Sequence, residues 1–288
     1  MESVMPRMKF KRFLRRCIGF ISFFAVIGLI IGALISIPVI HKPYIGTITI
    51  SGVILEQAYA DDILEMLSYA RDNRDIKAVI LQIDSPGGGA SVIEQVYLDV
   101  LRLKMQKPVV ASIGVMGASG GYYIAVASNF IYAEPNSQLG SIGAWTTLPT
   151  PEELKEDIIT TGPFKSTGGS RTKATLELER LRQEFTQAVM SQRGDRLKLS
   201  SEEISKAEIY TGAESLSLGL IDGIGTITDA KQKAAKLARI RNYGVVNLNE
   251  ELDMWEPYYW PIKWFSVKDL MSRADLMARY YYVYFEPG

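Results

Sequence analysis

The hydrophobic pattern opens with an uncharged run that differs from the rest of the chain. Residues 17–40 are 24 consecutive positions without a charged side chain, which is long enough to cross a hydrocarbon core of about 30 Å. Residues 1–16 carry six basic residues against one acidic residue. The positive-inside rule therefore predicts a cytoplasmic N-terminus and an extracytoplasmic remainder after about residue 41.

The same run is longer than the apolar part of a cleaved signal peptide, which usually has about 7–15 residues, and no small-x-small cleavage site follows it. We therefore expect a retained single-pass signal-anchor in the cell membrane. A cleaved signal peptide is the alternative.

After residue 44 the pattern alternates between strands and helices. Strands are expected at 45–51, 78–83, 108–113 and 130–133, and helices at 58–71, 90–103, 149–157, 176–193, 201–206 and 228–238. Strands separated by helices of this length imply right-handed crossovers and a parallel sheet. The sequence thus predicts an α/β fold, whose functional site should lie at the carboxyl edge of the sheet.

Composition and charge exclude several kinds of function. The 288 residues are 47% hydrophobic and carry no net charge, so nothing favours binding to nucleic acid. The single cysteine, Cys17, rules out an intrachain disulfide or a zinc cluster. The glycine-rich turn expected at 84–89 has neither Walker nor dinucleotide-binding spacing. We expect no cofactor and no metal.

Ser119 is the candidate nucleophile. Residues 114–117 are expected to form a tight turn after the strand 108–113, and a helix is expected from 122, which puts Ser119 at a helix N-terminus. Unpaired amides and the helix dipole there favour a developing oxyanion. The alternative is an ordinary helix N-cap serine. The glycine-rich turns 84–89 and 114–117 leave successive strands and are in position to face each other.

A serine hydroxyl needs a base to remove its proton. The one histidine, His41, adjoins the membrane segment and is poorly placed to be that base. A neutral lysine can replace histidine if burial lowers its pKa. Lys165 is the candidate, because it lies beside Phe164 between an apolar segment and a Gly/Ser/Thr stretch. The alternative is a solvated surface lysine.

Six segments together resemble the signal peptide peptidase A family of bacteria and archaea: 84–88, 117–123, 140–143, 162–166, 210–212 and 219–222. The resemblance implies a ClpP/crotonase-like fold and cleavage of signal peptides after their release. It also implies a Ser/Lys dyad of Ser119 and Lys165, with an oxyanion hole formed by the amides of Gly88 and Gly120. The family loop usually begins with Asn where this chain has Asp84, so this carboxylate should point away from the oxyanion site.

The resemblance further implies a homo-oligomer, in which the serine and the lysine can come from neighbouring protomers. Peptide substrates would bind as an added strand beside residues 50–54 and 87–91, with apolar side chains at P1 and P3. The other readings are a protease acting on stomatin-type partners, a crotonase-like acyl-CoA enzyme, and a pseudoenzyme scaffold that binds extended peptides.

The expected organisation is a basic cytoplasmic segment (1–16), a signal-anchor (17–40), a serine peptidase domain (44–240) and a C-terminal tail (241–288). Three of the four tryptophans and several tyrosines lie in this tail, interleaved with basic residues. Such a composition suits a membrane surface. Packing on the domain or on another subunit is the alternative.

Overall fold

The computed structural model describes residues 7–36, 42–147, 161–165, 168–254 and 281–283. These residues belong to two compact units, Met1–Lys42 and Pro43–Gly288. Each unit is described by itself.

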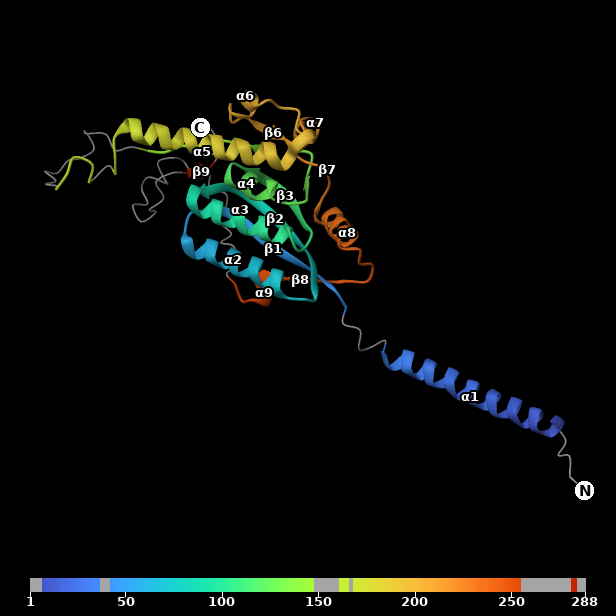
Figure 1. Cartoon of the computed structure of the whole chain (residues 1–288). Helices are drawn as coiled ribbons and strands as arrows, with labels where there is room; N and C mark the ends of the chain where they lie inside the picture. Colours follow the sequence, from blue (N-terminus) through green and yellow to red (C-terminus); the bar gives the residue numbers. More distant parts are fainter. Residues whose placement is uncertain (1–6, 37–41, 148–160, 166–167, 255–280, 284–288) are drawn as a thin grey trace, which may run out of the picture. The chain divides into compact units, whose positions relative to one another are not determined.

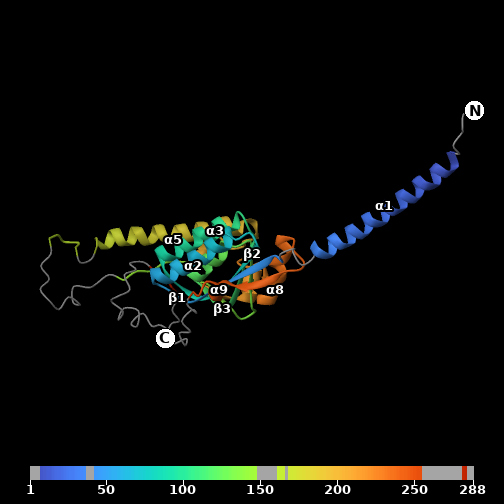
Figure 2. The ribbon, with the colours of Figure 1, turned by 90° about the horizontal axis from the view of Figure 1, so that it is seen from below.

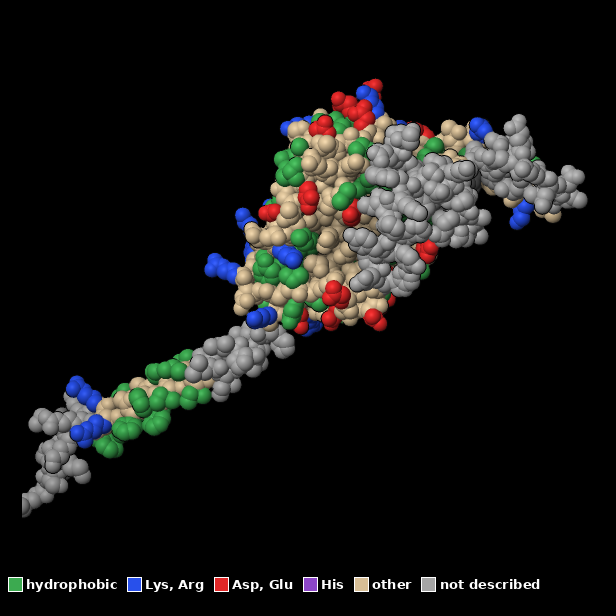
Figure 3. Space-filling model, turned by 180° about the vertical axis from the view of Figure 1, so that it is seen from behind, with side chains coloured by type: hydrophobic (Ala, Val, Ile, Leu, Met, Phe, Trp, Pro, Cys, Tyr) green, Lys and Arg blue, Asp and Glu red, His purple; other side chains and the backbone are tan. Residues whose placement is uncertain are grey.

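The first unit is a single helix, α1 (Arg7–Ser36). Its segment Phe13–Gly32 has the length and mean hydropathy needed to cross a membrane, and is the one such segment in the described part of the chain. Its apolar side chains are exposed, and Figure 3 shows them along the helix. The expected span, 17–40, therefore overlaps this helix but begins later, and its last four residues lie outside the described ranges.

The second unit is built on a mostly parallel sheet. Its central strands are β1 (Tyr44–Ile54), β2 (Ile76–Gly89) and β3 (Val109–Ala118), and the strand order is β6-β5-β3-β2-β1-β8 with β4 also paired to β3. The shorter strands are β4 (Phe130–Ala133), β5 (Gln138–Gly140), β6 (Ile209–Thr211), β7 (Gly223–Ile224), β8 (Gly244–Asn247) and β9 (Tyr281–Val283). The predicted α/β class is confirmed.

Helices cover both faces of this sheet. They are α2 (Gln57–Asp72), α3 (Ala90–Lys104), α4 (Gly120–Val126), α5 (Arg171–Arg193), α6 (Ser201–Ile204), α7 (Gly212–Ser217), α8 (Ile227–Ala238) and α9 (Leu248–Glu251), with a 3-10 turn at Gly194–Arg196. Successive side chains of a strand point to opposite faces. In β2, Val79 and Leu81 accordingly pack with α2 to α5, whereas Ala78 and Ile80 pack with α8. Figures 1 and 2 show α2 to α5 on one side of the sheet and α8 on the other.

Two segments expected as turns, 84–89 and 114–117, are instead the last parts of β2 and β3. Glycine and proline usually interrupt strands, but here neighbouring backbones use the space that glycine leaves. A Cβ added at Gly88 would lie 1.8 Å from the carbonyl oxygen of Ile54 on β1. Close pairing with β1 therefore extends β2 through its glycines. The helix expected at 149–157 lies outside the described residues.

A buried ion pair fixes the C-terminal end of α5. Arg193 donates two hydrogen bonds of 2.9 Å to Asp222, and the two side chains are 2% and 6% exposed. Burial acts to raise the pKa of Asp222, but the hydrogen bonds and charge of Arg193, with the Ile131 amide and Arg196, hold it below its usual value.

We expect Asp222→Asn to lower the free energy of unfolding at pH 7 by about 3 kcal/mol, because it leaves Arg193 buried without its counter-ion. A depressed carboxyl pKa contributes stability above the unfolded-state value of about 4, and this contribution is lost as pH falls through the folded-state value. In urea unfolding, the free energy of unfolding of the variant should therefore fall less between pH 7 and pH 3 than that of the wild type. The control is Glu184→Gln, which breaks an exposed pair with Arg180 and should cost at most about 1 kcal/mol.

Candidate active site

Ser119 occupies the junction between β3 and α4 in a strained backbone conformation. Its φ is 50° and its ψ is −118°, a combination that favours glycine. The Ser119 amide donates to the Gly140 carbonyl at 2.8 Å, and its carbonyl accepts from the Tyr123 amide at 2.9 Å. Strain of this kind costs on the order of 1–3 kcal/mol and is retained where the surroundings enforce it.

The side chain of Ser119 does not act as an ordinary helix cap. The residue holds the N-cap position of α4, but its hydroxyl makes no capping hydrogen bond. The first amides of a helix have no acceptor within the helix, and α4 is buried along its length. The Tyr122 hydroxyl fixes α4 by donating to the Leu220 carbonyl at 2.7 Å. The buried Ser119 hydroxyl therefore lies at the N-terminal, positive end of α4, a helix that is fixed in place by its surroundings.

The glycine-rich end of β2 lies against this helix end. A Cβ added at Gly87 would lie 2.6 Å from the Gly120 nitrogen, and one added at Gly121 would lie 2.4 Å from the Ser85 carbonyl oxygen. The Gly87 amide donates to the Ser85 hydroxyl at 3.1 Å, and φ at Gly87 is 105°. The structure therefore brings the glycine segment containing Gly88 next to Ser119 and Gly120.

Asp84 is tied to β3. Its Oδ1 accepts a hydrogen bond of 3.0 Å from the Met116 amide. Burial is the largest influence on its carboxyl group and raises its pKa. The backbone of β3 thus holds the Asp84 carboxylate.

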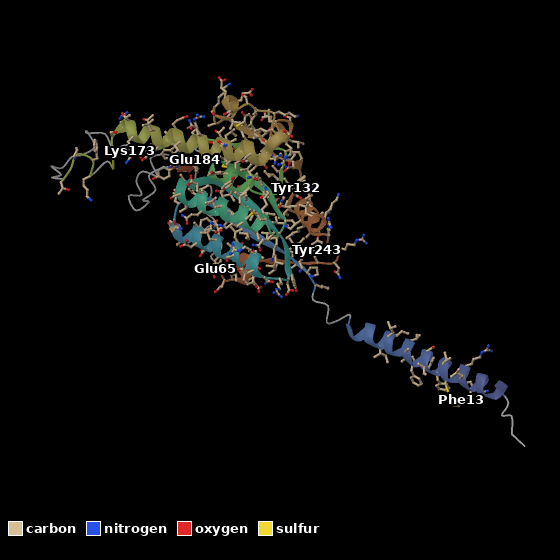
Figure 4. All side chains as sticks on the ribbon, viewed as in Figure 1. Phe13, Glu65, Tyr132, Lys173, Glu184 and Tyr243 are labelled. Carbon is tan, nitrogen blue, oxygen red and sulfur yellow. The ribbon has the colours of Figure 1, made fainter. Side chains whose placement is uncertain are left out.

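Lys165 is not part of this cluster in the single chain. It is exposed in the turn before α5, where its amide donates to the Gly162 carbonyl at 3.2 Å. Among the described residues, no hydrogen bond joins the Lys165 amine to Ser119. In Figure 4, Lys173 marks the beginning of α5, the element that follows this turn. Three of the four expected site residues therefore come together, and the fourth stands apart.

Two other lysines have a lowered pKa, but they lie at the end of the sheet where β3 begins, whereas Ser119 lies at the end where β3 finishes. Burial is the main cause of the lowered pKa of Lys104 and of Lys107. Both precede the first residue of β3, whereas Ser119 follows its last. Ten strand residues span about 30 Å, so neither amine reaches the Ser119 hydroxyl.

Comparison with known proteins agrees with the motifs of this site. The sequence model of Peptidase family S49 matches residues 102–241, a range that includes Ser119, Gly120 and Lys165. The chain belongs to peptidase family S49. The family expected from the sequence is thereby confirmed.

Relatives of this S49 chain include three proteases and peptidases. It is 31% identical to Protease 4 of Haemophilus influenzae over 68% of this chain and 35% of that protein. It is 34% identical to the chloroplastic serine protease SPPA of Arabidopsis thaliana over 61% of this chain and 28% of that protein. It is 25% identical to the putative signal peptide peptidase SppA of Enterococcus faecium over 68% of this chain and 61% of that protein. The chain thus spans about a third of the length of the first two relatives.

Sequence reasoning missed strand β9, which lies beside the candidate site. Its residues Tyr281–Val283 pair with the glycine end of β2. The aromatic composition of the tail is the signal that could have pointed to it, but composition alone could not select a partner. Most of the tail, 255–280 and 284–288, lies outside the described residues.

Proposed function

We propose that the chain is a membrane-anchored serine endopeptidase that cleaves extended peptides, with Ser119 as its nucleophile. The observation that carries this proposal is the conformation of Ser119 at the N-terminus of α4. Its backbone is strained, its side chain is buried, and its hydroxyl makes no capping hydrogen bond. The glycine-rich end of β2 lies next to it. The membership in family S49 supports the same reaction class.

In the proposed reaction the Ser119 hydroxyl attacks a peptide carbonyl carbon while Lys165 accepts its proton. The amides of Gly88 and Gly120 donate to the resulting oxyanion. The lysine then protonates the leaving amine, and water hydrolyses the acyl-enzyme ester. Because Lys165 is exposed in the single chain, we propose that a neighbouring copy in a homo-oligomer completes the dyad and excludes water from the lysine.

The proposed substrates are signal peptides after their release and other unstructured peptides. One relative carries the name signal peptide peptidase, and an extended peptide can pair with the glycine end of β2 in the position that β9 takes in this structure. The proposed topology places the N-terminus in the cytoplasm and the sheet domain outside, since basic residues precede the apolar part of α1.

Active-site labelling tests this proposal. A fluorophosphonate probe should modify Ser119 in the full-length protein, as mapped by mass spectrometry of its peptides, and Ser119→Ala should remain unlabelled. Lys165→Ala should slow the labelling by at least 100-fold, whereas Lys173→Ala, an exposed lysine on α5, should label at the wild-type rate.

Two results would overturn parts of the proposal. Absence of label on Ser119 in the wild-type oligomer would exclude a nucleophilic serine. Equal labelling of Lys165→Ala and wild type would remove Lys165 from the mechanism and leave Ser119 in place.

A further inference from the structure

Charge is distributed unequally between the two ends of the parallel sheet. The segments that lead into β1, β2, β3 and β8 carry nine basic and two acidic residues, over 42–43, 71–75, 102–108 and 236–243. At the other ends of β1, β2 and β4, the segments 55–62, 84–95 and 134–137 carry six acidic residues and no basic one. Because these strands are parallel, the basic segments gather opposite the end that holds Ser119.

Strand pairing brings three of the basic segments side by side. Tyr44, the first residue of β1, pairs with Ile76 on β2 and with Gly244 on β8. The Tyr44 amide donates to the Asp75 carbonyl at 2.8 Å, and the Gly244 amide donates to the Pro43 carbonyl at 2.9 Å. Basic residues two or three positions before this row are therefore neighbours on the surface.

Helix α8 adds its last turn to this group. The Lys233 amine lies 3.7 Å from the ring centroid of Phe130, the first residue of β4. The helix therefore ends where the strands begin, and the chain continues through Tyr243, labelled in Figure 4, into β8. We define the basic edge as the exposed cations Lys42, Arg74, Lys236, Arg239 and Arg241. Among the described residues, none of these five forms an ion pair with a carboxylate.

Exposed apolar side chains lie at the same end of the sheet. Tyr44 is 40% exposed, Leu237 on α8 is 39% exposed, and Met105, between α3 and β3, is 80% exposed. Cations interleaved with aromatic and aliphatic side chains are typical of surfaces that lie on a lipid interface, where the apolar groups enter the headgroup region. A dissolved phosphate would pair with the cations but leave these apolar side chains in water.

The length of the connection to α1 favours the same partner. α1 ends at Ser36 and β1 begins at Tyr44, so residues 37–43 join the two elements. Seven residues reach at most about 25 Å when fully extended. With α1 in a membrane, as proposed above, this attachment keeps the start of β1 at high local concentration beside the lipid surface. A contact too weak to form between separate partners can then form.

We propose, relying on the membrane anchoring proposed above but not on the peptidase reaction, that the basic edge binds anionic lipid headgroups at the surface of the membrane that holds α1. Lipid phosphates accept hydrogen bonds from the lysines and arginines, and each such residue near an anionic surface shifts the equilibrium by about fivefold. Tyr44, Met105 and Leu237 enter the headgroup layer. Ser119, at the far end of the ten residues of β3, then faces water about 30 Å from the lipid.

Fluorescence quenching in nanodiscs tests the lipid contact with the full-length protein. An NBD dye is attached at Leu237→Cys in a Cys17→Ser background, and a lipid with a spin-labelled headgroup quenches it. Quenching should be severalfold stronger with about 30% phosphatidylglycerol than with phosphatidylcholine alone, and it should fall as the salt concentration rises. A dye at Asp61→Cys, in the exposed first turns of α2 at the other end of the sheet, should be quenched weakly in both lipids.

Charge reversal with a matched control assigns the contact to the basic edge. Lys236→Glu/Arg241→Glu should lower the binding equilibrium by about 30-fold or more, from about fivefold for each cation removed, so that quenching falls to its value in phosphatidylcholine. Lys173→Glu/Arg180→Glu makes the same change of net charge at exposed positions of α5 and should leave quenching unchanged. Equal quenching in the two lipids, or in the wild type and Lys236→Glu/Arg241→Glu, would overturn the proposal.

Other occupants and other failures give different results. If Lys236→Glu/Arg241→Glu lowered the mass of the oligomer in light scattering while quenching did not depend on the lipid, the basic edge would bind the acidic end of another copy, and the proposal would be wrong. Failure of the full-length protein to enter nanodiscs would overturn the anchoring itself. Absence of fluorophosphonate label on Ser119 with lipid-dependent quenching intact would overturn the peptidase function and support the lipid contact.

Discussion

Ser119→Ala is expected to lower kcat/KM for an unstructured peptide by a factor on the order of 10⁴ to 10⁶, because loss of a serine nucleophile removes the covalent route altogether. The thermal midpoint should stay close to that of wild type, since the side chain makes no capping hydrogen bond to α4. Ser119→Gly should lose activity equally but gain stability, by about 1 kcal/mol, because glycine adopts this backbone conformation without strain. Peptide hydrolysis and urea unfolding of the two variants would measure both effects.

Ser112→Ala provides the matched control for this pair. Ser112 is a buried serine within β3, seven positions before Ser119, and its replacement should leave kcat/KM within about twofold of wild type. A Ser119→Ala protein that retained a tenth of wild-type activity would contradict the nucleophile assignment. A Ser119→Gly protein less stable than wild type would contradict the inference of backbone strain.

Local patterns in the sequence predicted the framework of the fold because periodicity reports burial directly. The strand at 130–133 has the predicted bounds, and the helix predicted at 58–71 is one residue longer at each end. Ser119 was placed at a helix N-terminus by the strand before it and the helix after it, and the structure has it at the N-cap of α4. The peptidase family followed from the order of six motifs and is confirmed by the comparisons.

The remaining features depend on contacts between distant segments, which no local pattern encodes. The pattern at 84–89 predicts a turn, but pairing with β1 and β9 makes this segment the last part of strand β2. The seating of Tyr282 likewise joins residues nearly 200 positions apart. The burial expected for Lys165 is absent from the single chain. Burial of Lys165 by a neighbouring copy would depend on contacts between chains, which the sequence pattern of one chain does not encode.

Gly88→Ala is expected to reduce kcat by about 10²- to 10³-fold, the usual effect of losing one oxyanion-hole donor. The added Cβ would lie 1.8 Å from the Ile54 carbonyl oxygen and 2.4 Å from its carbon. These are backbone atoms of a neighbouring strand and cannot rotate away, so the end of β2 must separate from β1. The Gly88 amide is then displaced from the proposed oxyanion hole, and we expect a loss of stability of about 1–3 kcal/mol as well. Single-turnover kinetics and urea unfolding would measure the two losses.

Two other glycines separate the catalytic loss from the structural one. A Cβ added at Gly212 would lie 1.9 Å from the Glu134 carbonyl oxygen, at the start of α7 and outside the proposed oxyanion hole. Gly212→Ala should therefore destabilise the fold by a similar amount but keep kcat within a few-fold of wild type at temperatures where it remains folded. Gly114→Ala has its nearest neighbour at 3.9 Å and should change neither quantity. If Gly88→Ala and Gly212→Ala lost kcat equally, the effect at Gly88 would be general destabilisation, and its amide would not belong to the oxyanion hole.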